Sequence, residues 1–226
     1  MPDETRNLML KVVVGSRAHG LADPDSDYDY RGVFVNPTRE ILSLFGSTKQ
    51  TSWLEKDKPG GEDDTAWEIG HFLHLALHCN PTILEVFTAP VVEATEEGRA
   101  LKGLFPAVWH PKRVRDAFVG YGLNQRKKFL ERKDARPNKY AGAYLRVLCQ
   151  AERLLRTGSL VVDMTGHAEF NTLRRWRRGE YQVGEVIDKC LAWQVRVEEV
   201  AEACKQQPQP DMVDAFLLEI RRKHWQ

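Results

Sequence analysis

The sequence predicts an α+β fold: a small mixed β-sheet with helices up to about residue 109, followed by a helical half. Runs of β-branched and alternating residues lie in the first half, and long apolar repeats with helical spacing begin at Pro111. With 226 residues, of which 42% are hydrophobic, the chain can bury a core as one domain or as two small ones. We therefore expect two domains, residues 1–109 and residues 110–226.

Two strands are predicted near the start of the chain. Residues 8–14 contain three consecutive valines ahead of a glycine, which is typical of a buried strand. Residues 16–21 are expected to begin a short helix, and a proline between aspartates predicts a loop over residues 23–26. Residues 28–35 alternate and are rich in β-forming side chains, so they are predicted to form the second strand.

The later elements follow from shorter signals. A short helix is expected over residues 37–44, and a Pro-Gly-Gly sequence predicts a flexible loop or hairpin tip over residues 56–64. A third short strand is predicted over residues 65–69, followed by helices over residues 71–79 and 80–87. Long helices are predicted over residues 114–132, residues 138–157 ended by Gly158, residues 185–205 and residues 212–224.

The net charge of +1 conceals a strong asymmetry. Residues 1–109 contain 10 Lys and Arg against 17 Asp and Glu, whereas residues 110–180 contain 17 against 7. An acidic half that holds metal ions beside a strongly basic segment suits an enzyme that binds a polyanion. The alternative is that these cations only solvate helix faces, and composition does not decide between the two.

Composition also restricts the compartment. No apolar stretch approaches the length that spans a bilayer, and the charged amino terminus lacks the core of a signal peptide. We expect a cytoplasmic protein without a membrane partner. Its cysteines form no Cys-x-x-Cys pair and are expected to be reduced, partly buried residues: Cys79, Cys149, Cys190 and Cys204.

The most informative segment joins a glycine turn to a pair of acids. Gly15 and Ser16 follow the predicted first strand and can offer backbone N–H groups and a hydroxyl to phosphate. Asp27 and Asp29 can hold a divalent metal, because alternation puts them on one face of a strand, about 7 Å apart along it. Alternatively, Gly15 is an ordinary turn glycine, Ser16 caps a helix, and the two aspartates lie on a solvated turn and strand edge.

The pattern Gly-Ser-x(10)-Asp-x-Asp resembles the motif of the DNA polymerase beta superfamily of nucleotidyltransferases. Residues 15–21 and 26–35 resemble, more specifically, the RNA-repair-pathway DNA polymerase beta family associated with RNA ligases, and the resemblance continues over residues 80–85 and 154–158. It implies a nucleotidyltransferase core with Mg²⁺ or Mn²⁺ as cofactor. It also implies transfer of a nucleoside monophosphate from an NTP to an acceptor hydroxyl, the acceptor being a tRNA-like RNA 3′ end.

Two divalent ions require a third acid beside Asp27 and Asp29. Glu68 is our first choice, because it lies in the third predicted strand and matches the position of the third acid in the resembling family. Asp63 and Asp64 are second choices, because the preceding glycines place them on a mobile loop. The predicted catalytic and metal-binding set is therefore Asp27, Asp29 and Glu68.

Basic residues complete the predicted nucleotide site. Arg17 can clamp a triphosphate oxygen, and His19 can contact pyrophosphate or the base; surface or capping roles remain open for both. In the helical half, Lys139, Arg146 and Arg153 recur every seven residues along one helix face. The resemblance favours Lys139 and Arg146 as nucleotide-binding residues, with a solvated face as the alternative.

Three further features each allow more than one interpretation. His71, His74 and His78 share a helix face and could bind a metal, although a partly exposed face is the simpler interpretation. Glu85 is expected to be structural and to buttress the site through Asn80 or a basic partner. Residues 174–178 mix four arginines with a tryptophan that could stack on an unpaired base, or they could form an exposed turn.

Two other classes of function remain open. A nucleotidyltransferase could instead modify a protein or a small molecule, as toxins and antibiotic-modifying enzymes do. A catalytically inactive binding protein is also possible, but the intact acids argue against it.

Overall fold

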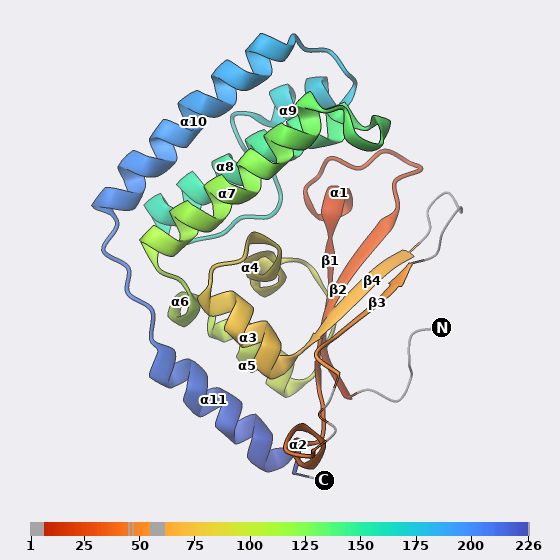
Figure 1. The fold of residues 1–226 in the computed structure, drawn as a ribbon, viewed down its shortest axis with the longest axis vertical. Helices are drawn as coiled ribbons and strands as arrows, with labels where there is room; N and C mark the ends of the chain where they lie inside the picture. Colours follow the sequence, from red (N-terminus) through yellow and green to blue (C-terminus); the bar gives the residue numbers. More distant parts are fainter. Residues whose placement is uncertain (1–6, 45, 47, 55–61, 226) are drawn as a thin grey trace. The chain divides into compact units, whose positions relative to one another are not determined.

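The computed structural model describes residues 7–44, 46, 48–54 and 62–225 (Figure 1). The chain forms two compact units. The first consists of Met1–Leu77, Thr82–Val108 and Pro208–Gln226, and the second of His78–Pro81 and Trp109–Gln207. The expected boundary near residue 109 is therefore present, but residues 208–226 return to the first unit. The prediction that the helical domain extends over all of residues 110–226 is wrong for this last segment.

Within the described residues, five strands form one mixed sheet in the order β3-β4-β2-β1-β5. β2 pairs with β4 in parallel, whereas the other neighbouring strands are antiparallel. The α+β class with a small mixed sheet is thus confirmed. The strands are β1 (Asn7–Val14), β2 (Tyr28–Val35), β3 (Gln50–Leu54), β4 (Glu62–Glu68) and β5 (Val91–Ala94).

β4 begins earlier than the sequence pattern predicts. The strand starts at Glu62, because β2 offers it a parallel partner from Tyr28 onward. Asp63 and Asp64 are therefore strand residues, and the expectation that they lie on a loop is wrong. Residues 56–61 of the expected loop lie outside the described residues. β3 and β5 have no counterpart among the predicted elements.

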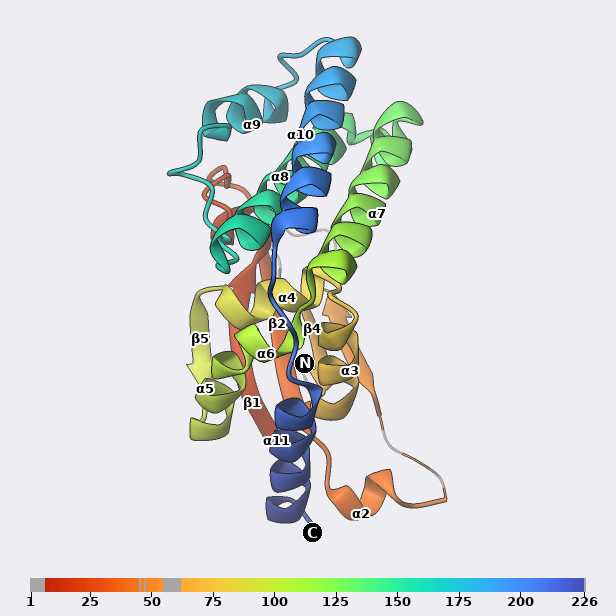
Figure 2. The same cartoon turned by 90° about the vertical axis from the view of Figure 1, so that its left-hand side faces the viewer.

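Alternation along the central strands buries one face of the sheet. Val12, Val14 and Val33 are almost completely buried on this face. α3 packs on β2 and β4, and α5 packs on β1 and β5. Figure 2 shows the same elements turned by 90°. The helices of this part of the first unit are α1 (Gly15–Ala18), α2 (Thr38–Ile41), α3 (Ile69–Leu77), α4 (Pro81–Thr88), α5 (Glu96–Gly103) and α6 (Phe105–Val108).

The last helix, α11 (Pro210–Lys223), is part of the first unit. It packs on α3 and α6, and its Val213 and Ile220 are buried. Thr38 of α2 forms two hydrogen bonds with the carboxyl end of α11. Its hydroxyl donates to the Arg221 carbonyl at 2.7 Å, and its N–H donates to the His224 carbonyl at 2.7 Å. α11 is therefore a structural component of the unit that contains the sheet.

The second unit is helical. α8 packs against α7 and α10, and a Cβ atom at Gly122 of α7 would lie 3.1 Å from the Tyr144 ring of α8. Gly158 ends α8 in the left-handed conformation, with φ of +74°, as the sequence predicts. The helices of the second unit are α7 (Pro111–Leu130), η1 (Lys133–Ala135), α8 (Pro137–Thr157), α9 (Phe170–Arg177) and α10 (Val183–Ala203).

α9 corrects one expectation from the sequence. The arginine-rich residues 174–177 lie in the last turns of this helix and not in an exposed turn. Trp176 is fully buried and donates its indole N–H to Glu185 at 3.3 Å. Its ring is therefore not exposed for stacking on a base.

The cysteines behave as expected. Cys79, Cys149 and Cys190 are buried, Cys204 is half-buried, and all four are free thiols. Burial raises the pKa of the first three thiols. No helix in the described residues combines the length and the apolar character needed to cross a bilayer.

Candidate active site

The turn after β1 lies directly against the acid on β2. Val14 ends β1 in register with Asp29, and α1 begins at the next residue, Gly15. Gly15 has a φ of +68°, and a Cβ atom at this position would overlap Oδ2 of Asp29. Glycine is thus required both by the backbone conformation and by the contact. The predicted phosphate turn and the predicted acid touch each other, and Ser16 follows in the same half-buried turn.

A second acid lies beside Asp29. Asp29 and Asp63 are in register on the parallel strands β2 and β4, so their side chains point to the same face of the sheet. Neighbouring strands are about 4.8 Å apart, which makes the two carboxylates neighbours. The Asp63 side chain is 34% exposed. Asp27 is exposed and immediately precedes β2, where alternation puts it on the Asp29 side.

The structure places Glu68, the predicted third metal ligand, away from Asp29 and Asp63. Glu68 is in register with Phe34, five residues beyond Asp63 on β4. An odd offset turns its side chain to the opposite face, and the rise along a strand puts it about 16 Å away. Both Glu68 oxygens are bound by Arg221 of α11, at 2.6 and 2.9 Å, and the carboxylate is buried. Its position fits a structural ion pair.

Asp64 is also directed away from Asp29. It is one residue beyond Asp63 and therefore points to the other face of the sheet. There its carboxylate forms an ion pair with Lys11 at 2.7 Å. The Lys11 ammonium also lies 4.4 Å from the centre of the Tyr30 ring. Of the acids on β4, Asp63 is the one in register with Asp29.

Arg17 is engaged by the loop that precedes β2. Its Nη2 donates to the Ser26 carbonyl at 2.7 Å, and its guanidinium lies 3.7 Å from the centre of the Tyr28 ring. These contacts hold the loop between the phosphate turn and Asp27. Nucleotide binding by Arg17 stays a prediction.

His19 connects the phosphate turn to the core of the first unit. It is 6% exposed, and its Nε2 lies 2.7 Å from Oε1 of Glu85 on α4. α4 is fixed by buried side chains that include Leu84 and Phe87. The expectation that Glu85 buttresses the site through a basic partner agrees with this geometry, and the partner is His19. Direct contact of His19 with a nucleotide stays a prediction.

The remaining predicted residues are on α8, on α3 and directly after α3. Lys139 and Arg146 are on α8 of the second unit, where Arg146 donates to Oε1 of Gln150 at 2.7 Å. Their role in nucleotide binding therefore stays a prediction. On α3, His71 is half-buried and His74 is exposed, as is His78 just after the helix.

The acids near Gly15 fit magnesium or manganese better than zinc. Mg²⁺ takes oxygen ligands and is usually bound by one or two carboxylates together with substrate phosphates. In the part of the chain that the structure describes, no three His, Cys, Asp or Glu side chains form a ready metal centre. Asp29 and Asp63, with Asp27 nearby and a glycine turn alongside, fit a cation that shares its ligands with a triphosphate.

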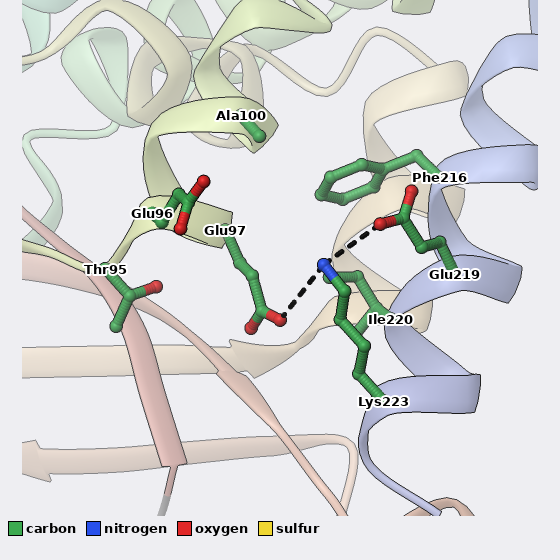
Figure 3. A pocket seen from close by; sticks show the side chains of 8 residues that line it. All are labelled: Thr95, Glu96, Glu97, Ala100, Phe216, Glu219, Ile220 and Lys223. Carbon is green, nitrogen blue, oxygen red and sulfur yellow. Dashed lines mark ion pairs between the residues drawn. The ribbon is translucent and has the colours of Figure 1, made fainter.

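A pocket between α5 and α11 has the wrong charge for a nucleotide. It has a volume of about 400 Å³ and is shown in Figure 3. Its lysine, Lys223, is paired with Glu219 at 2.9 Å and with Glu97 at 3.8 Å, and Glu96 adds a third carboxylate. A triphosphate would meet three acids and one neutralised cation there. The cluster around Gly15 is thus the better candidate.

One comparison with known proteins decides the family. A sequence model of the RNA repair pathway DNA polymerase beta family matches residues 2–219. The chain belongs to this family. The match includes the segment with Gly15, Asp27 and Asp29, and it also extends through the second unit and most of α11. The resemblance seen in the motif therefore covers nearly the whole chain.

Individual proteins with similar sequences come from a bacterium and a phage. The protein YcgL of Bacillus subtilis is 27% identical over 187 residues, which cover 76% of this chain and 71% of YcgL. A 38.9 kDa protein from the nrdC-mobD intergenic region of phage T4 is 28% identical over 88 residues, covering 36% of this chain and 26% of the phage protein.

A solved structure also shows similarity. It is that of a nucleotidyltransferase-like protein from Exiguobacterium sibiricum, with a TM-score of 0.32 and 11% identity. The match covers 96% of this chain and 74% of the other.

Sequence reasoning missed Arg31 as a member of the cluster. It stands in the segment that resembles the family, two residues after Asp29, and alternation alone would have placed it on the same face. Asp63 was harder to find, because its position depends on the parallel register of β4.

Proposed function

We propose that the protein is a metal-dependent nucleotidyltransferase that transfers a nucleoside monophosphate from an NTP to the 3′ hydroxyl of an RNA. The observation that carries this proposal is the contact between Gly15 and Asp29, which brings a phosphate-binding turn against a metal-binding acid. Membership in a family of RNA repair DNA polymerase beta proteins supports the reaction class and the acceptor.

The metal would be held by Asp27 and Asp29, with Asp63 as the acid beside them. A Mg²⁺ or Mn²⁺ ion bound there neutralises the attacking and leaving oxygens of phosphoryl transfer. Asp27 and Asp63 are both accessible, so ligands from a bound nucleotide can complete the coordination sphere.

The protein side chains would orient the reactants and accept one proton. The turn at Gly15 and Ser16 binds the triphosphate through backbone N–H groups and the serine hydroxyl. The acceptor oxygen forms a bond to the α-phosphorus, the bond from that phosphorus to the bridging oxygen breaks, and pyrophosphate leaves. The hydroxyl proton passes to a carboxylate of the aspartate cluster.

An RNA acceptor is supported by charge as well as by family. Residues 110–180 carry ten more positive than negative side chains, and this whole segment belongs to the second unit. Such a segment attracts a phosphate backbone. Lys139 and Arg146 on α8 are our candidates for contacts with the RNA or with the NTP.

Labelled nucleotides test the proposal. The protein is incubated with each labelled NTP, Mg²⁺ or Mn²⁺, and RNA that ends in either a 3′ hydroxyl or a 3′ deoxy group. We expect label only in the RNA with the hydroxyl, and a loss of at least about a hundredfold in Asp27→Asn and Asp29→Asn. Asp25→Asn is the matched control, since Asp25 is an exposed aspartate of the same loop. Label that appears only in protein would instead support the protein-modifying alternative.

A further inference from the structure

Arg31 lies within the acid cluster and not on an open surface. It is on the same face of β2 as Asp29, two residues further along. Its Nη2 is 3.5 Å from Oδ2 of Asp63, and its side chain is only 17% exposed. A positive charge is therefore enclosed next to the acids proposed to hold the metal.

The contacts of Arg31 show that the backbone holds it more firmly than the carboxylate does. Nη1 donates to the Tyr30 carbonyl at 2.6 Å and has a longer contact of 3.4 Å to the Asp63 carbonyl. The 3.5 Å separation from the carboxylate exceeds the roughly 2.7–2.9 Å of a charge-assisted hydrogen bond. Asp63 can thus turn toward another cation while Arg31 keeps its place.

Two carboxylates in register on adjacent strands repel each other unless a positive charge offsets them. Arg31 supplies such a charge from within the protein, and a bound divalent cation would supply it from outside. The two cations therefore compete for the same acids. They also repel each other, since they would lie about 7 Å apart, which is the spacing of alternate residues on a strand.

We propose that Arg31 is the resident counter-ion of Asp29 and Asp63 and that it lowers the affinity of this site for divalent cations. The inference rests on the proposed function, because that function assigns the metal to these acids. It adds a residue that sets how tightly the metal binds. Repulsion between a single and a double charge at this distance corresponds to about tenfold in affinity, even in a high-dielectric site.

Titration with Mn²⁺ alone, followed by electron paramagnetic resonance, tests this role without measuring activity. We expect Arg31→Gln to bind Mn²⁺ about tenfold more tightly than the wild type. Arg31→Lys, which keeps the charge, should stay within about twofold. Arg39→Gln is the matched control, since it removes an exposed arginine from α2, outside the cluster. A purely structural role predicts the opposite sign, because a loosened site binds the metal more weakly.

Failure of the counter-ion role and failure of the proposed metal site give different results. If folded Arg31→Gln binds Mn²⁺ with unchanged or weaker affinity, the counter-ion role is overturned. If Asp29→Asn leaves the Mn²⁺ affinity of the wild type unchanged, the metal site of the proposed function fails first. Should Arg31→Gln not fold, the Arg31 Nε resonance of the wild type is followed by NMR during a Mg²⁺ titration. A shift that disappears in Asp63→Asn supports the proposal, and no shift at saturating Mg²⁺ contradicts it.

Discussion

The contact between Gly15 and Asp29 is an example of how one missing side chain shapes a site. The carboxylate occupies the space that a Cβ atom would need, and the positive φ of Gly15 excludes most other residues on its own. The turn can therefore approach the acid closely enough for one bound group to touch both.

Gly15→Ala should impair the site more than the fold. We expect nucleotide incorporation to fall by at least about a hundredfold, because the new methyl group displaces the Asp29 carboxylate. The free energy of unfolding should fall by about 1–3 kcal/mol, since alanine is strained at this φ. Gly103→Ala is the control, because Gly103 has nothing within 4 Å of its Cβ position and no positive φ. Normal incorporation by Gly15→Ala would contradict the proposed use of this turn.

Local sequence patterns were sufficient to predict those site residues that lie close together in the sequence. Gly15, Asp27 and Asp29 lie in one short segment, so a strand, a turn and alternation suffice to place them. The placement of Glu68 failed because it required the register of β4 on β2, which no local pattern encodes. The partners His19 and Glu85 are 66 residues apart, and only the fold brings them together.

At the scale of elements, β4 has two functions at its two ends. Asp63 near its start lies beside Asp29, whereas Glu68 at its end binds Arg221 of α11. The parallel register connects the two ends, because a strand that aligns Asp63 with Asp29 must bring Glu68 to the level of Phe34. Attachment of α11 and alignment of the acids thus depend on the same strand.

Glu68→Ala should destabilise the first unit without changing metal affinity. Removal of the carboxylate leaves the half-buried Arg221 guanidinium without its acid, and breaking a buried pair costs about 3–5 kcal/mol, which is the upper bound here. Chemical denaturation measures this loss, and Mn²⁺ titration of the folded fraction measures the affinity. Glu219→Ala serves as control, since its pair with Lys223 is exposed and contributes about 0–1 kcal/mol. Loss of Mn²⁺ binding in folded Glu68→Ala would restore Glu68 as a metal ligand.

At the scale of the whole molecule, charge and fold divide the chain at nearly the same place. The sheet-containing unit includes most of the acidic first 109 residues, and the helical unit includes the basic segment, residues 110–180. On α8, Lys139 is exposed and Arg146 and Arg153 are half-buried, with seven residues between successive members. Seven residues are close to two helical turns, so the three cations lie along one face.

RNA binding should depend on salt through this row. We expect replacement of all three residues by glutamine to reduce the slope of log affinity against log salt by about 2, since each contact with single-stranded phosphate contributes about 0.7. Fluorescence anisotropy at several salt concentrations measures the slope. The control replaces three exposed cations elsewhere, Lys112, Lys205 and Arg222, and should reduce the slope less. An unchanged slope in the α8 variant would show that this row does not contact RNA.

The position of α11 has a consequence for synthesis on the ribosome. The sheet is encoded before the second unit, yet the partner of the buried Glu68 is Arg221, which is translated more than 150 residues later. During synthesis the sheet is therefore present before Arg221 can pair with Glu68. The helical unit is contiguous apart from His78–Pro81, so it emerges and can fold in this interval. Ribosomes paused before residue 210 would carry a first unit that is still incomplete.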